Sequence, residues 1–101
     1  MKRGEIWLAD LGYVGKVRPV LILSVLPGDS DRALVTYVIR TTSIRGTAYE
    51  VGHKAYGMIP GAFDAQGIGT TDRSHLIRRL CLIEAATLIA IEQRVRAWLA
   101  L

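Results

Sequence analysis

The chain has 101 residues, half of them hydrophobic, which suits a single domain over residues 1–101 and excludes a disordered chain. Its apolar runs are far shorter than the roughly 20 residues that a membrane-spanning helix needs, so no membrane association is expected. The net charge is +4, and ten of the 13 cationic side chains are arginines, whose forked guanidinium groups suit phosphate-rich partners such as nucleic acids.

The first residues, Met1, Lys2 and Arg3, lead directly into a charged, strand-like segment. A secretory signal needs an apolar stretch followed by a cleavage site of small residues, so we expect a cytoplasmic protein. One cysteine and two histidines, none at the paired spacing of metal ligands, indicate neither a metal site nor a bound cofactor.

The first two-thirds of the chain has the pattern of short strands separated by glycine-containing turns. This pattern predicts strands at residues 4–11, 19–26, 33–39 and 48–53, and a weaker strand at residues 65–71. The second of these segments is almost wholly apolar, as is typical of a strand that is buried on both faces. Pro19 is expected at its beginning, because proline cannot donate a hydrogen bond within a sheet.

The last third of the chain changes to a helical period. Thr71 or Asp72 is expected to cap a short helix over residues 73–80. A longer helix is predicted over about residues 84–99, because an apolar stripe recurs at helical spacing through Leu88, Ile91, Val95 and Trp98. About five strands followed by these helices predict a mainly-β fold, a small SH3-like barrel with a short helix and a C-terminal helix.

Three stretches of the sequence resemble one protein family when they are taken together. Residues 3–11 read RGEIWLADL, residues 16–24 read KVRPVLILS, and residues 41–51 read TTSIRGTAYEV. The segments GAFDAQ and LIRRL follow at residues 61–66 and 76–80. Their order and spacing over nearly the whole chain resemble the PemK/MazF family of toxins from type II toxin–antitoxin systems.

The resemblance implies both an activity and a set of partners. Such a toxin is an SH3-like homodimer that cuts single-stranded RNA without a metal ion, leaving a 2′,3′-cyclic phosphate and a 5′-hydroxyl. A cognate antitoxin blocks its active groove. The family's catalytic arginine precedes the proline of an Arg-Pro pair, which is Arg18 here, and its catalytic threonine falls on Thr41. Thr42 then occupies the adjoining serine position and is a third catalytic candidate.

The chemistry of RNA cleavage fits these two residue types. The 2′-oxygen must lose a proton, and the negative charge that grows on the phosphate must be stabilised. Arg18 can grip phosphate oxygens, and the Thr41 hydroxyl can donate to the same group. Arginine is a poor base because it stays protonated, so the base is open. His53 is one candidate, since neutral imidazole suits the task, and a solvated strand-end residue is the other reading of it.

Other residues near these positions are candidates for RNA binding. Lys16, Arg40 and Arg45 either hold flanking phosphates or belong to solvated basic loops. Asp64 and Gln66 are similar to the family's Asp-x-Gln segment, which implies that they orient Arg18 or contact a base.

A second hypothesis keeps the fold but not the chemistry. The loop over residues 12–17 is short and lacks the Glu-Gln pair that many relatives carry there. A non-catalytic CcdB-like toxin or binding module, acting on a protein target or on nucleic acid, is therefore the alternative. Fold alone does not separate the two hypotheses, whereas the presence of both Arg18 and Thr41 favours the nuclease.

Overall fold

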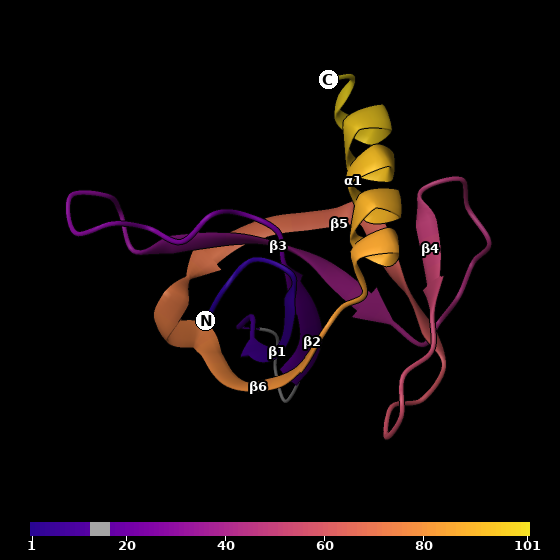
Figure 1. Cartoon of the computed structure of the whole chain (residues 1–101), viewed down its shortest axis with the longest axis horizontal. Helices are drawn as coiled ribbons and strands as arrows, with labels where there is room; N and C mark the ends of the chain where they lie inside the picture. The colour runs from indigo at the N-terminus through magenta and orange to yellow at the C-terminus, as the bar shows by residue number, and fades with distance from the viewer. Residues whose placement is uncertain (13–16) are drawn as a thin grey trace.

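The computed structural model describes residues 1–12 and 17–101 of the chain (Figure 1). These residues form six antiparallel strands, one 3₁₀ turn and one α-helix. The predicted mainly-β class is thereby confirmed. The elements are β1 (Glu5–Asp10), β2 (Val17–Ile22), β3 (Leu34–Thr41), β4 (Glu50–His53), β5 (Gly61–Asp72), η1 (Arg73–His75), β6 (Leu76–Leu82) and α1 (Ala85–Leu99). The strands form a single sheet in the order β4-β5-β3-β2-β1-β6.

The sheet buries two apolar clusters, because successive side chains of a strand point to opposite faces. Leu21 and Val38 point to the face that α1 covers, and they pack there in a cluster that includes Phe63 and Ile91. The other cluster contains Ala9, Val20, Ile22, Val35 and Leu76. Three successive residues of β2, Val20 to Ile22, are thus wholly buried, which confirms that this strand is covered on both faces.

The ends of several predicted strands shift in the structure. β2 ends at Ile22, and Val25 is 79% exposed, so residues 23–26 are not part of a buried strand. Pro19 is the third residue of β2 and not the first, and it lies just before the pairing with β3 begins at Val20. The fifth strand, predicted to be weak over residues 65–71, is the longest, since β5 runs from Gly61 to Asp72.

The predicted short helix over residues 73–80 is wrong. Only Arg73–His75 forms a 3₁₀ turn, and Asp72 caps it as predicted, by accepting a hydrogen bond from the Ser74 amide at 2.9 Å. Leu76–Leu82 is instead β6, which pairs with β1. The backbone groups of β1 that face away from β2 need partners, and that requirement outweighs the local helical pattern. Within the described chain, β4 and β6 are the two edges of the sheet, which is therefore not closed into a full barrel.

The C-terminal helix was predicted over about residues 84–99, and α1 confirms this prediction by spanning Ala85–Leu99. Ile91 and Val95 are its buried positions, and they face the cluster beneath the sheet. Trp98 is 42% exposed and packs edge-on against Tyr49 beside β4, with ring centroids 5.3 Å apart. No helix in the part of the chain that the structure describes is long and apolar enough to cross a membrane.

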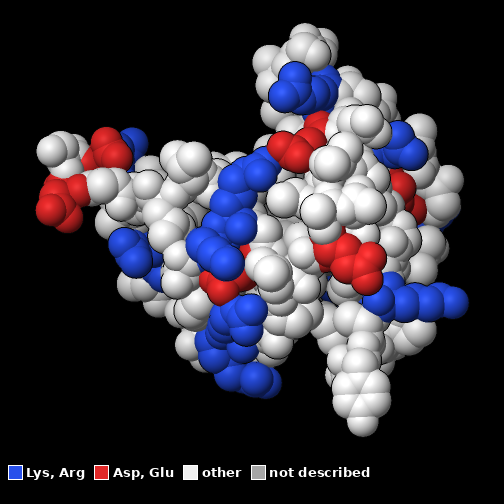
Figure 2. Space-filling view, viewed as in Figure 1, with Lys and Arg blue, Asp and Glu red and all other residues white. Residues whose placement is uncertain are grey.

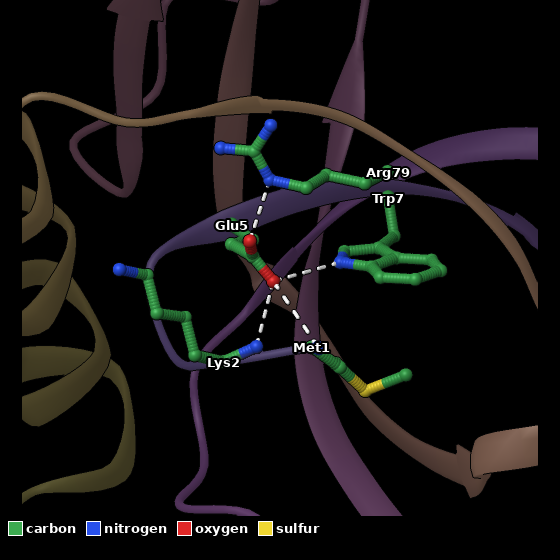
Figure 3. A network of polar contacts seen from close by, with 5 residues as sticks. All are labelled: Met1, Lys2, Glu5, Trp7 and Arg79. Carbon is green, nitrogen blue, oxygen red and sulfur yellow. Dashed lines mark hydrogen bonds and ion pairs between the residues drawn. The ribbon is translucent and has the colours of Figure 1, made fainter.

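A buried carboxylate joins the N-terminus to two strands (Figure 3). Glu5 is only 6% exposed, and its carboxylate accepts hydrogen bonds from the Lys2 amide, the Trp7 indole and the Arg79 guanidinium. Burial raises the pKa of Glu5, but these donors and the nearby amino terminus outweigh it and hold the pKa below its usual value. Glu5 therefore links β1 to β6 as an anion.

Candidate active site

The register of the sheet places several predicted site residues on one face. Val20 of β2 pairs with Ile39 of β3, and continuing this pairing by two residues sets Arg18 opposite Thr41. Ile39 pairs in turn with Asp64 of β5, which pairs with Glu50 of β4. Directly paired residues point to the same face, so these side chains share the face opposite α1. Adjacent strands lie about 4.8 Å apart, which brings the set within reach of one ligand.

Two adjacent hollows meet at Arg18, Thr41 and Ser43, and we call them together the Arg18 groove. The larger hollow has a volume of about 450 Å³ and is completed by Ile39, Arg45, Thr47, Glu50, Asp64 and Gln66. The smaller has a volume of about 320 Å³ and is completed by Val17, Pro19, Arg40 and Thr42. The structure thus brings together the predicted residues Arg18, Thr41, Thr42, Arg45, Asp64 and Gln66. Lys16 lies outside the described residues.

Hydrogen bonds to the backbone shape the wall of the groove. The Glu50 carboxylate accepts from the amides of Arg45 and Thr47 at 3.0 to 3.2 Å, and these amides lower the pKa of Glu50. Thr41 Oγ1 accepts from the Ser43 amide at 3.0 Å. The Thr41 hydroxyl proton has no acceptor among the described residues, which suits a phosphate oxygen in that role.

Sequence reasoning missed Ser43, Thr47 and Glu50 as members of the groove. One signal was present, because Thr47-x-x-Glu50 has the spacing of a capping box. That pattern usually begins a helix. Here only half of that bonding is made: Glu50 accepts from the Thr47 amide, whereas the Thr47 hydroxyl accepts from the Tyr49 amide. These bonds close the loop before β4.

Arg40 points to the other face of the sheet, because it pairs with Phe63 and not with Asp64. It is only 4% exposed. Its Nε donates to His53 Nδ1 at 2.9 Å, and one terminal nitrogen donates to the carbonyls of His53 and Ile59 at 3.1 and 2.7 Å. Although Arg40 borders the smaller hollow, its guanidinium is engaged beneath the sheet, and this geometry does not support the expected grip on a phosphate.

His53 also lies outside the Arg18 groove. Its ring packs on Phe63, with centroids 4.9 Å apart, and it lines a separate hollow with Lys54 and Glu84 at the start of α1. Burial lowers the pKa of His53, the Arg40 charge lowers it further, and Glu84 opposes the shift. A neutral His53 accepts from Arg40. The structure therefore does not bring this candidate base to Arg18 and Thr41.

Positive charge also gathers away from the groove. Figure 2 shows a band of lysine and arginine side chains that runs down over β6. Arg78 and Arg79 are exposed on that strand, and they pair with Leu8 and Trp7 of β1. Among the described residues, no group of three or more His, Cys, Asp or Glu side chains gathers as a metal ion would require.

The chain is a short, mainly-β domain in which Arg18 and Thr41 line one groove on the open face of the sheet. The family model of PemK-like, MazF-like toxins of type II toxin–antitoxin systems matches residues 2–99. The chain therefore belongs to this family, as its sequence resemblance predicted.

Solved structures agree with this assignment. The chain is similar to an endoribonuclease from a mycobacterial species in complex with its cognate antitoxin, with 28% identity, a TM-score of 0.86, and coverage of 100% of this chain and 96% of that one. An endoribonuclease from a mycobacterial species is 26% identical, with a TM-score of 0.82 and coverage of 100% and 92%. The Mycobacterium tuberculosis toxin MazF-mt6 is 27% identical, with a TM-score of 0.81 and coverage of 96% and 97%. No curated protein sequence matches the chain significantly.

Proposed function

We propose that this toxin is an endoribonuclease that cuts single-stranded RNA without a metal ion. In the proposed reaction the 2′-oxygen attacks the adjacent phosphorus, leaving a 2′,3′-cyclic phosphate and a 5′-hydroxyl. The observation that carries the proposal is the pair Arg18 and Thr41. Arg18 lies near the start of β2 and Thr41 at the end of β3, on one open face of the sheet. Similarity to two mycobacterial endoribonucleases supports the same activity.

Each member of the pair has a defined chemical task. Arg18 neutralises the charge that grows on the non-bridging phosphate oxygens, and its planar fork can hold two of them at once. Thr41 donates its hydroxyl proton to the same phosphate, since its oxygen already accepts from the Ser43 amide. Because the Arg18 guanidinium supplies the positive charge, the proposed reaction needs no metal ion.

Residues around the pair are proposed to hold the flanking RNA. Thr42 lies in the smaller hollow, and Arg45 and Gln66 lie in the larger one. A hydroxyl in one hollow and a cation and an amide in the other suit a strand that runs across both hollows. Lys16, two residues before Arg18, is proposed as a further phosphate contact.

The proposed partners are a cognate antitoxin and a second copy of the chain. A similar endoribonuclease binds its cognate antitoxin, which supports an antitoxin that covers the Arg18 groove. The exposed apolar residues Trp98, Leu99 and Leu101 at the C-terminus support a self-interface. RNA substrate and antitoxin together favour the cytoplasm as the site of action.

Incubating the purified protein with a long single-stranded RNA in EDTA tests the proposal. We expect discrete fragments whose ends are 2′,3′-cyclic phosphate and 5′-hydroxyl, as read by end-labelling before and after removal of the cyclic phosphate. The Arg18→Ala variant, purified in the same way, controls for a contaminating nuclease. Intact RNA across varied substrates, with folded protein, contradicts the proposal and favours the non-catalytic binder.

A further inference from the structure

The reaction needs a proton acceptor for the 2′-hydroxyl, and Arg18 cannot serve because a guanidinium stays protonated. Three groups are weighed as the base: the predicted candidate His53 and the two carboxylates that line the larger hollow, Glu50 and Asp64. His53 is on the opposite face of the sheet, and its Nδ1 accepts from buried Arg40. That leaves the two carboxylates of the larger hollow.

Glu50 is already committed to the backbone. One of its oxygens accepts from the amides of both Arg45 and Thr47, and the other accepts from the Arg45 amide. These donors stabilise the anion and lower its pKa, which weakens it as a base. Moving Glu50 toward a substrate would also release the loop that forms the wall of the groove.

Asp64 is placed differently. Its partner across the sheet is Ile39, which shares a face with Thr41 and, through Val20, with Arg18. Its Oδ1 accepts from the Gln66 amide at 3.0 Å, which fixes the orientation of the carboxylate. No described group donates to its Oδ2, and the half-buried side chain lines the larger hollow with Arg18. One oxygen thus holds the side chain, and the other remains to accept a proton.

We propose that Asp64 is the general base of this toxin, an inference that rests on the proposed nuclease function. Asp64 Oδ2 takes the proton of the 2′-hydroxyl as the 2′-oxygen forms its bond to phosphorus. The bond from phosphorus to the 5′-oxygen breaks, and the leaving oxygen takes its electron pair and a proton from water. Asp64 then returns its proton to solvent. Arg18 and Thr41 hold the phosphate throughout.

The Asp64→Asn variant tests this assignment, because an asparagine Oδ1 still accepts from the Gln66 amide while the basic oxygen is lost. We expect kcat to fall by about 10²- to 10⁴-fold, the range for loss of a general base. Affinity for a fully 2′-O-methylated RNA, which cannot react, is expected to stay within about twofold, as is typical when only a transition-state interaction is removed. The rise of kcat/KM with pH on the acid side is expected to disappear.

Asp72→Asn is the matched control. Asp72 also accepts from the amide two residues later, but it caps η1 away from the Arg18 groove. This variant is expected to cut RNA at the wild-type rate. Asp64→Glu, which restores a carboxylate, is expected to regain the acid-side rise of kcat/KM, and it keeps the proposal testable if Asp64→Asn folds poorly.

A folded Asp64→Asn variant that cuts at more than about a tenth of the wild-type rate would overturn the assignment, because loss of a general base costs far more. So would loss of the acid-side rise in Asp64→Glu. In either case a wild-type protein that cuts RNA leaves the nuclease function standing. If the wild-type protein cuts no RNA, the proposed function fails first, so the two failures are distinct.

Discussion

Arg18 and Arg40 lie near the same end of the sheet, and they show how differently two arginines can be used. Arg18 lines the open groove, and no hydrogen bond joins its guanidinium to the described residues. Arg40 is buried on the opposite face and donates to His53 and Ile59. A guanidinium whose donors are already used inside the protein cannot grip a substrate. The number and direction of its free donors, more than its charge, therefore separate a binding arginine from a structural one.

The largest expected effect follows from removing the open arginine. Arg18→Ala is expected to lower kcat by roughly 10²- to 10³-fold, because a charged donor to the growing oxyanion is lost. The free energy of unfolding, measured by urea denaturation, is expected to change little, since no described group depends on Arg18. A rate within threefold of wild type would show that Arg18 does not stabilise the reacting phosphate.

Removing the buried arginine is expected to do the opposite. Arg40→Ala leaves His53 Nδ1 and two carbonyls without their donor, so we expect a loss of about 3 kcal/mol in the free energy of unfolding. Circular dichroism during urea denaturation measures it. The kcat of the fraction that remains folded is expected to fall far less than in Arg18→Ala. An unchanged free energy of unfolding would show that the hydrogen bonds of Arg40 do not stabilise the fold.

The backbones of β5 and β3 approach closely at Gly61. A Cβ added at Gly61 would lie 2.5 Å from the Thr41 carbonyl oxygen and 2.9 Å from an Arg40 terminal nitrogen. Gly61→Ala is therefore expected to cost about 1 to 3 kcal/mol through overpacking. Gly52→Ala is the matched control on β4, because nothing lies within 4 Å of its added Cβ. Equal unfolding midpoints for the two variants would contradict the tight approach of β5 to the end of β3.

The smallest expected effect is a dependence of stability on pH. Burial, and then the Arg40 charge, lower the pKa of His53 in the folded chain. The unfolded chain takes up the proton near pH 6.5, so His53 contributes stability above that pH, and this stability is lost as the pH falls through the lower folded pKa. Urea midpoints at pH 7.5 and 5.0 measure the drop. The drop is expected to shrink in His53→Gln and to persist in His75→Gln, whose imidazole is exposed.

Local patterns in the sequence were enough to predict much of this molecule. The apolar run around Val20 predicted a strand covered on both faces. Asp72, one of two residues expected to cap a short helix, caps the 3₁₀ turn that forms there instead. The period through Ile91 and Val95 predicted α1. The motifs around Arg18 and Thr41 identified the family, and they marked two residues that the structure brings into one groove.

Only the tertiary structure decided which face of the sheet each site residue occupies. His53 follows Glu50 by three positions, yet it points away from Arg18, whereas Asp64 arrives from a distant strand and points toward it. The pairing of Leu76–Leu82 with β1, in place of a helix, was decided in the same way. The physical reason is that a one-residue change of register moves a side chain to the other face, and register is set by partner strands far away in the sequence.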